Sequence, residues 1–452
     1  MSHLFRRAIL LLIVNLLSCP QLAAQDTRVT AADVRQEFLH AWNAYKKFAW
    51  GHDALKPLSK KPHDWYQSSL LMTPLDAFDT MLIMGLKKEA AEAKEIVLTG
   101  LSFDKGMEVQ SFEITIRLLG GLLTAYQMDG DPRFLTLAED LGTRLLPVFN
   151  SATGMPYRFV NLKTGALRDS LNNPAEIGTA LIEFGTLSRL VGNPVYYEKA
   201  KIALVQLFNR RSKIGLVGTL INVETGEWVN RSSHIGGMID SYYETLLKSW
   251  LLFGDRDCKT MWDESIKAVN SFVADTTHGG LWYGVVDMET GKWLETSFGS
   301  LEAFFPAVLA LSGDLQRAAK LQESCFTMWM LHGIEPESIN YATMKVTDPR
   351  YVLRPEIIES AYYLRHYTKD RKYRKMGEIF FENLVRYCRT ESGYAALKSV
   401  VTKEKQDQME SFFLAETMKY LYLLLADEQA FDVENVIFNT EAHPVWPTWK
   451  KK

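Results

Sequence analysis

Apolar residues recur with a helical spacing along almost the whole chain, and the helices that they predict come in pairs. Between residues 30 and 440, an apolar helix repeatedly ends in a short turn, and an amphipathic helix follows the turn. The phrases are AYQMDGDPRF, SRLVGNPVYY, SWLLFGDRDC, LALSGDLQRA and RHYTKDRKYR, with turn residues Gly130, Gly192, Gly254, Gly313 and Lys369. These turn residues lie 62, 62, 59 and 56 residues apart, which indicates a repeated structural unit.

Two further turns extend the series to seven helix pairs, Gly85 in MGLKKEA and Asp427 in LLLADEQ. A second signal lies between the pairs and keeps nearly the same period. The segments LKTGAL, VETGEW and METGKW place Thr-Gly between strand-like runs, as β-hairpins do, with glycines at Gly165, Gly226 and Gly291. Each repeat is therefore predicted to contain a helix, a tight turn, a second helix and a hairpin at the opposite end.

Helix pairs of this size can stack in an open solenoid or close into a toroid. Closure is favoured because one helix of each pair is apolar almost all round, as expected of an inner ring. We therefore predict an all-α fold, an (α/α)7 barrel of seven helix pairs with small β-hairpins on one rim. No low-complexity linker or charge run divides the chain, so residues 25–452 are expected to form a single domain.

The first 24 residues have a different pattern. Arg6 and Arg7 precede the apolar run AILLLIVNLL, and the small residues Ala23 and Ala24 follow it. This layout is typical of a secretory signal peptide, and the apolar run is too short to span a bilayer. We expect an exported protein, periplasmic or secreted, without a transmembrane helix. The sequence LLSC, which ends at Cys19, leaves open a lipid anchor on that cysteine.

Composition excludes several classes of function. The chain of 452 residues is 47% hydrophobic and 23% charged, which is typical of a soluble globular protein, and its net charge of −3 offers no basic surface for nucleic acid. After removal of residues 1–24, Cys258, Cys325 and Cys388 remain, and three cysteines cannot all form disulfides. No Cys/His cluster indicates zinc. We expect a monomer.

Carboxylates recur where the apolar helices begin. Those at helix starts are Glu113, Glu183, Asp240, Glu244, Glu302, Glu356, Glu359 and Glu416. Capping and the helix dipole explain one acid at one helix start, but they explain poorly a ring of acids set among aromatic residues. Crowded carboxylates raise one another's pKa, so such a ring implies a bound metal, a shared proton, or both. An acid, a base and aromatic rings are also what the hydrolysis of a glycoside requires.

Five segments carry a resemblance to a known family. The segments FEITIRLLGGLL, GGMIDSYYETLLKSW, VLRPEIIESAYYL, SFFLAETMKYLYLLL and FNTEAHP resemble, in order and context, the class I α-1,2-mannosidases of glycoside hydrolase family 47. The resemblance extends from about Phe38 to Pro447 and is specific, because five motifs occur in register. It implies an (α/α)7 catalytic domain that binds Ca²⁺ and removes terminal α-1,2-linked mannose from mannose-rich glycans, including N-glycans, with inversion.

The resemblance also implies roles for single residues. The general acid falls on Glu113, the proposed base on Glu356 and a third catalytic acid on Asp240. Residues that match the pocket for the terminal mannose are Arg117, Glu244, Glu359, Phe412, Glu416 and Glu441. Thr440 matches the threonine whose carbonyl and hydroxyl contact the calcium. Glu183 of the acid ring and Arg354, beside Glu356, are further candidates for substrate binding.

The neighbours of the two main carboxylates suggest different protonation states. Glu113 follows Phe112, and an apolar setting would favour a protonated carboxyl. Glu356 starts its helix beside Arg354, and both the dipole and the cation are expected to keep it ionised.

Two departures from the family pattern concern the surface that meets the next sugar. The chain reads Gly299-Ser300-Leu301 where processing enzymes of the family have Asp-His-Leu, and Met238 stands where they have an arginine. In both places the chain is closer to the ER-degradation-enhancing mannosidase-like members of the family. The resemblance therefore does not predict which branch of a glycan the protein prefers.

Two other functions stay open beside hydrolysis of mannosides. A non-hydrolytic mannose-binding protein on the same barrel would need no acid and base together, and the three acids disfavour it. A lyase or glucosidase on an α/α toroid is the other alternative, but the nine histidines show no proton-transfer grouping.

Overall fold

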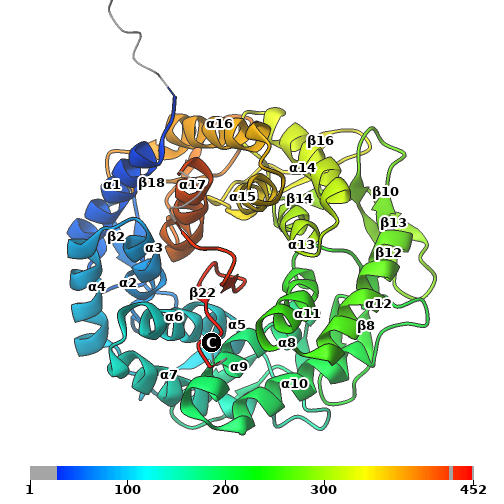
Figure 1. Cartoon of the computed structure of the whole chain (residues 1–452), viewed down its shortest axis with the longest axis horizontal. Coiled ribbons are helices and arrows are strands. Elements are labelled where there is room, and N and C mark those ends of the chain that lie inside the picture. The colour runs from blue at the N-terminus through cyan, green and yellow to red at the C-terminus, as the bar shows by residue number, and fades with distance from the viewer. Residues whose placement is uncertain (1–27, 427–430, 450–452) are drawn as a thin grey trace, which may run out of the picture.

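Two concentric rings of helices enclose a central axis in the computed structural model, which describes residues 28–426 and 431–449 (Figure 1). The predicted signal peptide, Cys19 and the turn at Asp427 lie outside the described residues. The inner ring contains α2 (Met72–Asp76), α3 (Phe78–Ile83), α5 (Ser111–Ile114), α6 (Gly120–Asp129), α8 (Pro174–Gly178), α9 (Leu181–Val191), α11 (Asp240–Phe253), α13 (Phe305–Leu311), α15 (Glu356–Thr368) and α17 (Met418–Leu425). The outer ring contains α1 (Ala31–Ala49), α4 (Lys87–Gly100), α7 (Pro132–Leu145), α10 (Pro194–Phe208), α12 (Arg256–Phe272), α14 (Leu315–Met330) and α16 (Arg371–Cys388). The predicted (α/α)7 barrel is confirmed.

The ring closes through contact between the two ends of the chain. Helix α1 packs against α17, so the outer partner of the last inner helix comes from the N-terminal part of the domain. The apolar stripe of α1 that makes this closure possible is fully buried and includes Val34, Phe38 and Trp42. Residues 431–449, which follow α17, contribute no outer helix and contain a β-hairpin instead.

The tight turns form as their sequences predict. Inner helices end at residues with a left-handed backbone, namely Gly130, Gly192, Gly254 and Lys369, with φ of 84°, 75°, 72° and 57°. The next residue then caps the outer helix, since its side chain accepts a hydrogen bond from a backbone N–H; these caps are Asp131, Asn193, Asp255 and Asp370. The pair, which is Gly-Asp, Gly-Asn or, at residues 369–370, Lys-Asp, thus ends one helix and starts the next.

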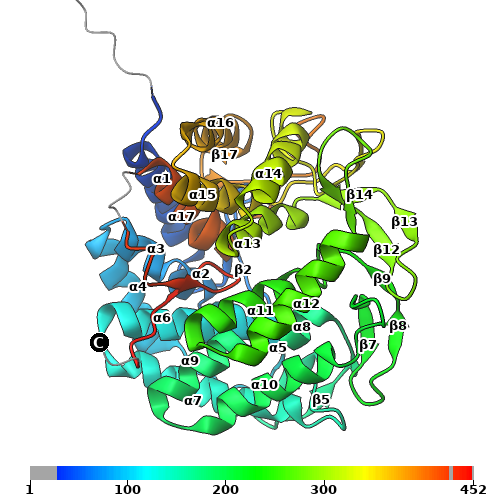
Figure 2. The ribbon, with the colours of Figure 1, turned by 45° about the vertical axis from the view of Figure 1, so that its right-hand side comes forward.

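Short antiparallel hairpins gather on the opposite rim, where the inner helices begin (Figure 2). The described three-stranded sheets are β3 (Glu108–Gln110), β4 (Phe159–Asn161) and β5 (Leu167–Arg168); β6 (Leu171–Asn172), β7 (Leu220–Asn222) and β8 (Trp228–Asn230); β9 (Ser232–Ser233), β12 (Val285–Asp287) and β13 (Trp293–Glu295); and β14 (Ser297–Gly299), β15 (Ser338–Asn340) and β16 (Lys345–Asp348). The two-stranded sheets on this rim are β1 (Ala54–Lys56) with β2 (Lys61–His63), β10 (Ala274–Asp275) with β11 (Trp282–Tyr283), β17 (Arg389–Thr390) with β18 (Gly393–Tyr394), and β19 (Ala396–Leu397) with β20 (Lys405–Gln406). One further pair, β21 (Ile437–Phe438) with β22 (Pro444–Val445), lies away from it.

The three predicted hairpin turns are present, and a fourth turn of the same kind was not predicted. Gly165, Gly226 and Gly291 each have a left-handed φ, of 69°, 74° and 67°. In the fourth turn, between β15 and β16, Met344 takes the left-handed place with φ of 53°. The missing glycine explains why the sequence pattern did not reveal this hairpin.

The C-terminal hairpin of β21 and β22 lies inside the inner ring (Figure 1). Thr124 in α6 donates a hydrogen bond to the carbonyl of Pro444 (2.9 Å), and Gln127 donates one to the carbonyl of Trp446 (2.8 Å). We call residues 437–445 the plug, because they fill the bore of the barrel from the side of the tight turns.

Two further expectations concern the membrane and the cysteines. None of the helices that the structure describes is long and apolar enough to cross a bilayer. Cys258, Cys325 and Cys388 are all buried and free of disulfides.

Candidate functional site

A cavity of about 440 Å³ opens at the rim where the inner helices begin. Eleven of the twelve residues for which the sequence predicts a catalytic, substrate-binding or metal-binding role line it: Glu113, Arg117, Asp240, Glu244, Arg354, Glu356, Glu359, Phe412, Glu416, Thr440 and Glu441. They come from five places in the barrel that are far apart in the chain. We call this space the carboxylate cavity.

The first turns of the inner helices place these side chains in pairs. On α11, Asp240 and Glu244 are four residues apart, and on α15, Glu356 and Glu359 are three apart, so both members of each pair face the same side. Arg117 and Glu416 lie instead on short π-helical segments, Thr115–Leu119 and Phe413–Thr417. Such segments are frequent at functional sites, and the sequence pattern did not predict them.

Negative charge exceeds positive charge around the carboxylate cavity. Its lining carboxylates are Glu113, Glu176, Asp240, Glu244, Glu356, Glu359, Glu416 and Glu441, eight in all, against the three guanidinium groups of Arg117, Arg158 and Arg354. Lys248 adds one ion pair from behind, with Glu244. Burial raises the pKa of Asp240 to about 7 and that of Glu359 to about 8, and it raises the pKa of Glu416 well above its usual value. The cavity therefore holds carboxylates that are only partly compensated by protein cations.

Glu113 does not have the apolar setting that the sequence led us to expect. Its Oε2 accepts a hydrogen bond from Arg117 Nε at 2.9 Å, and its side chain is 24% exposed. Arg117 in turn pairs with Glu441 of the plug and lies 3.8 Å from Asp76. The expectation is wrong because the arginine one helical turn further on points back to Glu113.

Glu356 lacks the close ion pair with Arg354 that the sequence led us to expect. Arg354 forms its close ion pair with Glu337, at 2.9 Å, whereas its distance to Glu356 Oε1 is 3.9 Å. The other oxygen of Glu356 is buried and has no hydrogen-bond partner among the described residues. Burial outweighs the attraction of Arg354 and raises the pKa of Glu356 to about 7.

Glu183, the twelfth candidate, does not line the carboxylate cavity. It is 1% exposed and accepts a hydrogen bond from Asn439 of the plug at 2.8 Å. Burial raises its pKa to about 7. The structure therefore places Glu183 against the plug and not at the surface of the carboxylate cavity.

Sequence reasoning missed Glu176, which lies on α8, the inner-ring helix just before the one that carries Glu183. Glu176 lines the cavity and accepts hydrogen bonds from Gln110 (2.8 Å), Asn173 (3.0 Å) and Arg158 (3.1 Å). The signal was the phrase Asn-Pro-Ala-Glu at the start of α8, in which Asn173 caps the helix and Glu176 follows three residues later. That pattern is also an ordinary helix start, which is why it did not stand out.

One of the two departures from the family pattern, Met238, lies at the cavity, and the other does not. Met238 is 41% exposed, lines the cavity and has a left-handed φ of 75°. Ser300 is fully buried and does not line it. A side chain at Gly299 would come within 2.1 Å of the carbonyl of Glu337, so an aspartate does not fit at this place.

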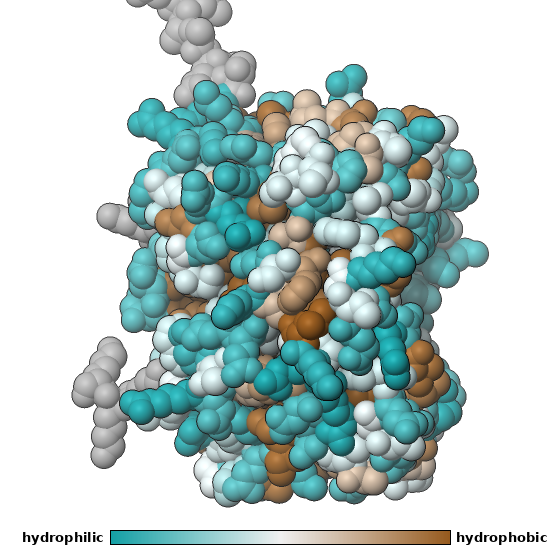
Figure 3. Space-filling view, turned by 90° about the vertical axis from the view of Figure 1, so that its right-hand side faces the viewer, coloured by the Kyte–Doolittle hydropathy of each residue, from teal (hydrophilic) through white to brown (hydrophobic). Residues whose placement is uncertain are grey.

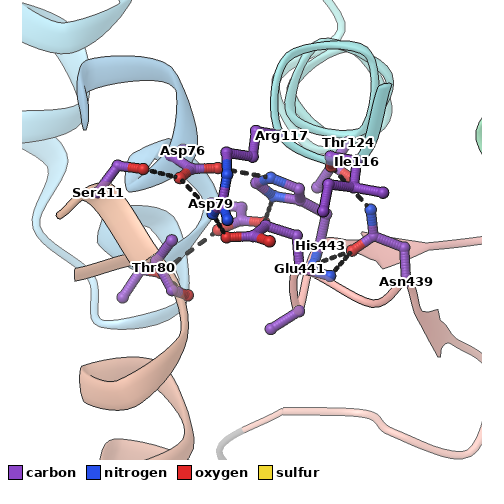
Figure 4. A network of polar contacts seen from close by, with 12 residues as sticks. Asp76, Asp79, Thr80, Ile116, Arg117, Thr124, Ser411, Asn439, Glu441 and His443 are labelled. Atoms are coloured by element: carbon purple, nitrogen blue, oxygen red, sulfur yellow. Dashed lines mark hydrogen bonds and ion pairs between the residues drawn. The ribbon is translucent and has the colours of Figure 1, made fainter. Parts of the chain in front are cut away.

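A buried polar network fixes the plug against the inner helices (Figure 4). His443 contacts Asp79 through Nδ1 (2.8 Å) and Asp76 through Nε2 (3.1 Å). Lys419 contacts Asp79 at 2.8 Å and donates to the carbonyl of Ala442 at 2.6 Å. The network thus anchors the segment that carries Thr440 to the cavity floor.

The donor atoms around Thr440 suit a hard cation. The described residues contain no group of three or more His, Cys, Asp or Glu side chains arranged to hold a metal directly. Thr440 offers a hydroxyl and a carbonyl that form no hydrogen bond with another described residue, and Glu441 and the other carboxylates line the same space. Ca²⁺ accepts six to eight oxygen ligands, including waters that carboxylates hold, so this oxygen-only set fits it.

Known proteins resemble the chain over nearly all of its length. The model of Glycosyl hydrolase family 47 matches residues 37–447. The human endoplasmic reticulum mannosyl-oligosaccharide 1,2-alpha-mannosidase is 37% identical over 444 residues, which are 91% of this chain and 63% of that enzyme. The mouse ER degradation-enhancing alpha-mannosidase-like protein 2 is 36% identical over 469 residues, or 95% and 79%. The solved structure of the alpha-1,2-mannosidase from Trichoderma reesei matches with a TM-score of 0.84 and 28% identity, over 92% of this chain and 98% of that one.

Proposed function

The chain belongs to glycosyl hydrolase family 47, and on this premise we propose that it is an exo-α-mannosidase that removes terminal α-1,2-linked mannose from mannose-rich oligosaccharides such as N-glycans. It is a glycoside hydrolase of the α-1,2-mannosidase type. The observation that supports the proposal most is that eight carboxylates and three phenylalanine rings line one cavity. Carboxylates supply the acid and the base of glycoside hydrolysis, and aromatic rings suit the apolar face of a pyranose.

The proposed reaction inverts the configuration at the sugar carbon. Glu113 donates a proton to the glycosidic oxygen as its bond to C1 breaks, and Glu356 takes a proton from the water whose oxygen bonds to C1. Asp240 positions this water or shares the role of the acid. A pKa of about 7 at Glu356 suits a base that works near neutral pH. Inversion requires room for water between acid and base, a separation of roughly 6.5–9.5 Å.

The proposal includes one Ca²⁺ held by the hydroxyl and carbonyl of Thr440. When bound, the ion supplies coordination sites for hydroxyls of the terminal mannose and offsets the surplus of negative charge. Glu244, Glu359 and Glu416 hold and orient the surrounding waters and sugar hydroxyls. Phe412 and Arg117 line the same space, and the guanidinium carbon of Arg117 lies 5.6 Å from the centre of the Phe412 ring.

We also propose that residues 1–24 direct export and are removed, with a lipid anchor on Cys19 as the alternative. The mass of the mature protein distinguishes the two, because cleavage after Ala24 removes Cys19.

Release of mannose from α-1,2-mannobiose tests the proposed function. We expect β-mannose to be the first product, as monitored by NMR within the first turnovers. We expect no release after exhaustive chelation, and recovery with Ca²⁺ rather than Mg²⁺, whose octahedral shell dehydrates reluctantly. α-1,6-Mannobiose is the control for linkage. Binding of the disaccharide without release would favour a mannose-binding protein, and α-mannose as the first product would refute inversion.

A further inference from the structure

Exposed apolar side chains gather on the hairpin rim. Of the eleven large hydrophobic residues that are exposed in the described chain, five lie on strands β6, β8 and β13 or in the loop before α11: Leu171, Val229, Met238, Trp293 and Leu294. Figure 3 views the side of the barrel on which β8, β12 and β13 lie, and apolar residues run down its middle between hydrophilic ones. Trp293, which is 43% exposed, has the largest side chain of the five, and its indole offers an apolar face and a polar N–H to a ligand.

Trp293 borders an open groove of about 650 Å³ between two hairpins. Polar side chains on its other sides are Thr296, Ser297, Ser338, Asn340 and Thr347. We call this space the Trp293 groove. It is separate from the carboxylate cavity, since the two have no lining residue in common.

The backbone supports the indole closely. A side chain at Gly284 would come within 2.7 Å of Cζ3 of Trp293, so the ring rests against a strand that has no side chain there. Gly284 lies next to β12, which pairs with β13 in an antiparallel register. The ring therefore has one supported side, and 43% of the residue remains open to solvent.

The two spaces are connected by two neighbouring strands. β14 runs from Ser297 in the Trp293 groove to Gly299, and Leu301, two residues further, lines the carboxylate cavity. β15 begins in the groove at Ser338, directly after Glu337, which pairs with Arg354 of the cavity. At about 3.3 Å per residue, Ser297 and Leu301 are roughly 13 Å apart at most. An oligosaccharide whose end fills the cavity must extend about that far to reach Ser297, at the near edge of the groove, and further to reach Trp293.

The chemistry of the groove favours a neutral ligand with many hydroxyls. Asn340 uses its carbonyl oxygen to accept from Thr343, and no hydrogen bond of its amide nitrogen to a described residue exists, which leaves that donor for a ligand. Ser338 and Thr347 form a hydroxyl pair at 2.6 Å at the groove wall. Glu295 is the one charged residue that lines the groove. Ring stacking with hydroxyl and amide donors is the chemistry by which proteins bind sugars.

We propose that the Trp293 groove is an outer subsite, in which inner sugar residues of a mannose-rich glycan stack on Trp293 while the terminal mannose occupies the carboxylate cavity. This inference rests on the proposed function, because the same oligosaccharide spans both spaces. The subsite distinguishes long substrates from short ones, since a disaccharide in the cavity does not reach the indole.

Trp293→Ala tests the subsite when two substrates are compared. For a mannose-rich N-glycan we expect KM to rise roughly tenfold, the loss of about one ring-stacking contact, with kcat little changed. For α-1,2-mannobiose we expect kcat/KM to stay within about twofold. Trp293→Tyr should recover most of the affinity for the N-glycan, because it restores a ring.

Trp50→Ala is the matched control. Trp50 is 37% exposed and borders a groove along α4, and it lines neither the carboxylate cavity nor the Trp293 groove, so its removal should affect neither substrate. Thermal unfolding of each variant verifies that it is folded. Equal losses on both substrates, or no loss on either, would overturn the subsite.

A binding measurement separates the subsite from the proposed function. Calorimetric titration of wild type and Trp293→Ala with the N-glycan needs no turnover. Weaker binding by the variant supports the groove even if wild type releases no mannose, a result that would refute hydrolysis alone. Equal binding by the two proteins refutes the groove even if hydrolysis is established.

Discussion

The plug network and the carboxylate cavity lie side by side in the bore of the barrel, and they treat buried charge in opposite ways. In the plug network, Asp79 and Asp76 face Lys419 and His443, and all four residues are at most 2% exposed. Burial alone would raise the pKa of Asp79, but Lys419 and His443 hold it below its usual value. In the cavity, burial raises the pKa of Glu356 to about 7, because Arg354 is engaged by Glu337.

This difference separates charge that maintains the fold from charge that awaits a ligand. A buried carboxylate with a close cation is a structural element, and removal of one partner leaves the other unpaired. A carboxylate that is held without a full complement of partners is unfavourable in the free protein, and it is retained where a substrate, proton or metal completes it. Arg117 links the two regions, since it pairs with Glu113 and Glu441 and approaches Asp76.

The largest expected effect comes from a substitution in the carboxylate cavity. Glu356→Gln should lower kcat for α-1,2-mannobiose by about 10²–10⁴-fold, the usual contribution of an acid or base, and leave the free energy of unfolding unchanged or higher. Stability should not fall, because the variant removes a buried charge that lacks a close cation. Steady-state kinetics and urea unfolding measure the two quantities.

Substrates with activated aryl leaving groups sharpen the assignment of roles. Glu113→Gln should spare them, since they need little protonation, whereas Glu356→Gln should lose them with the natural substrate. Survival of the aryl substrate only in the Glu356 variant would reverse acid and base. If kcat falls by less than about tenfold in both variants, other carboxylates are the catalytic ones.

The second prediction concerns the paired side. Asp79→Ala leaves Lys419 buried without its carboxylate and removes one of the two acids that His443 contacts, so unfolding free energy should fall by about 3–5 kcal/mol. Urea unfolding measures the loss. Glu391→Ala is the control, because this side chain is 84% exposed and its pair with Lys60 contributes under about 1 kcal/mol. Similar losses of unfolding free energy in both variants would show that the buried network contributes no more to stability than an exposed ion pair.

Local patterns and the family motifs predicted different parts of this molecule. The Gly-Asp turns and Thr-Gly hairpins follow from residue types over four or five positions, so the helix pairs could be predicted from the residues alone. The convergence of Glu113, Asp240 and Glu356 followed from the repeat, because equivalent helix starts share a rim. The ion-pair partners of these acids could not be predicted from the sequence. Arg354, for example, forms its close ion pair with Glu337 and not with Glu356, because the loop places Glu337 nearer.

The plug was the least predictable part. His443 and Asp79 are 364 residues apart, and no local pattern connects them. The motif FNTEAHP drew attention to Thr440 and Glu441 through the resemblance, but not to His443 as the anchor. Gln110 and Arg158 escaped notice because they come from β3 and the segment before β4, where polar residues are common.

The smallest expected effect is a dependence of stability on pH that belongs to the cavity. The pKa of Glu356 and of Asp240 is raised to about 7 in the folded protein, above the usual carboxylate range, so the folded state binds protons that the unfolded state has already lost. Stability from these groups is fully present below about pH 4 and is lost as the pH rises through 7. In the presence of chelator, the melting temperature should therefore fall between pH 5 and pH 8.

Glu356→Gln isolates the contribution of Glu356 to this slope. His443 contributes a loss of the same sign, because Asp79 and Asp76 raise its pKa against the effect of burial, and that part persists in the variant. The slope between pH 5 and pH 8 should be shallower in Glu356→Gln than in wild type, and added Ca²⁺ should flatten the wild-type slope in the same way. Equal slopes in the two proteins would mean that Glu356 is ionised throughout, and the contrast between the cavity and the plug would then rest on hydrogen bonding rather than on charge.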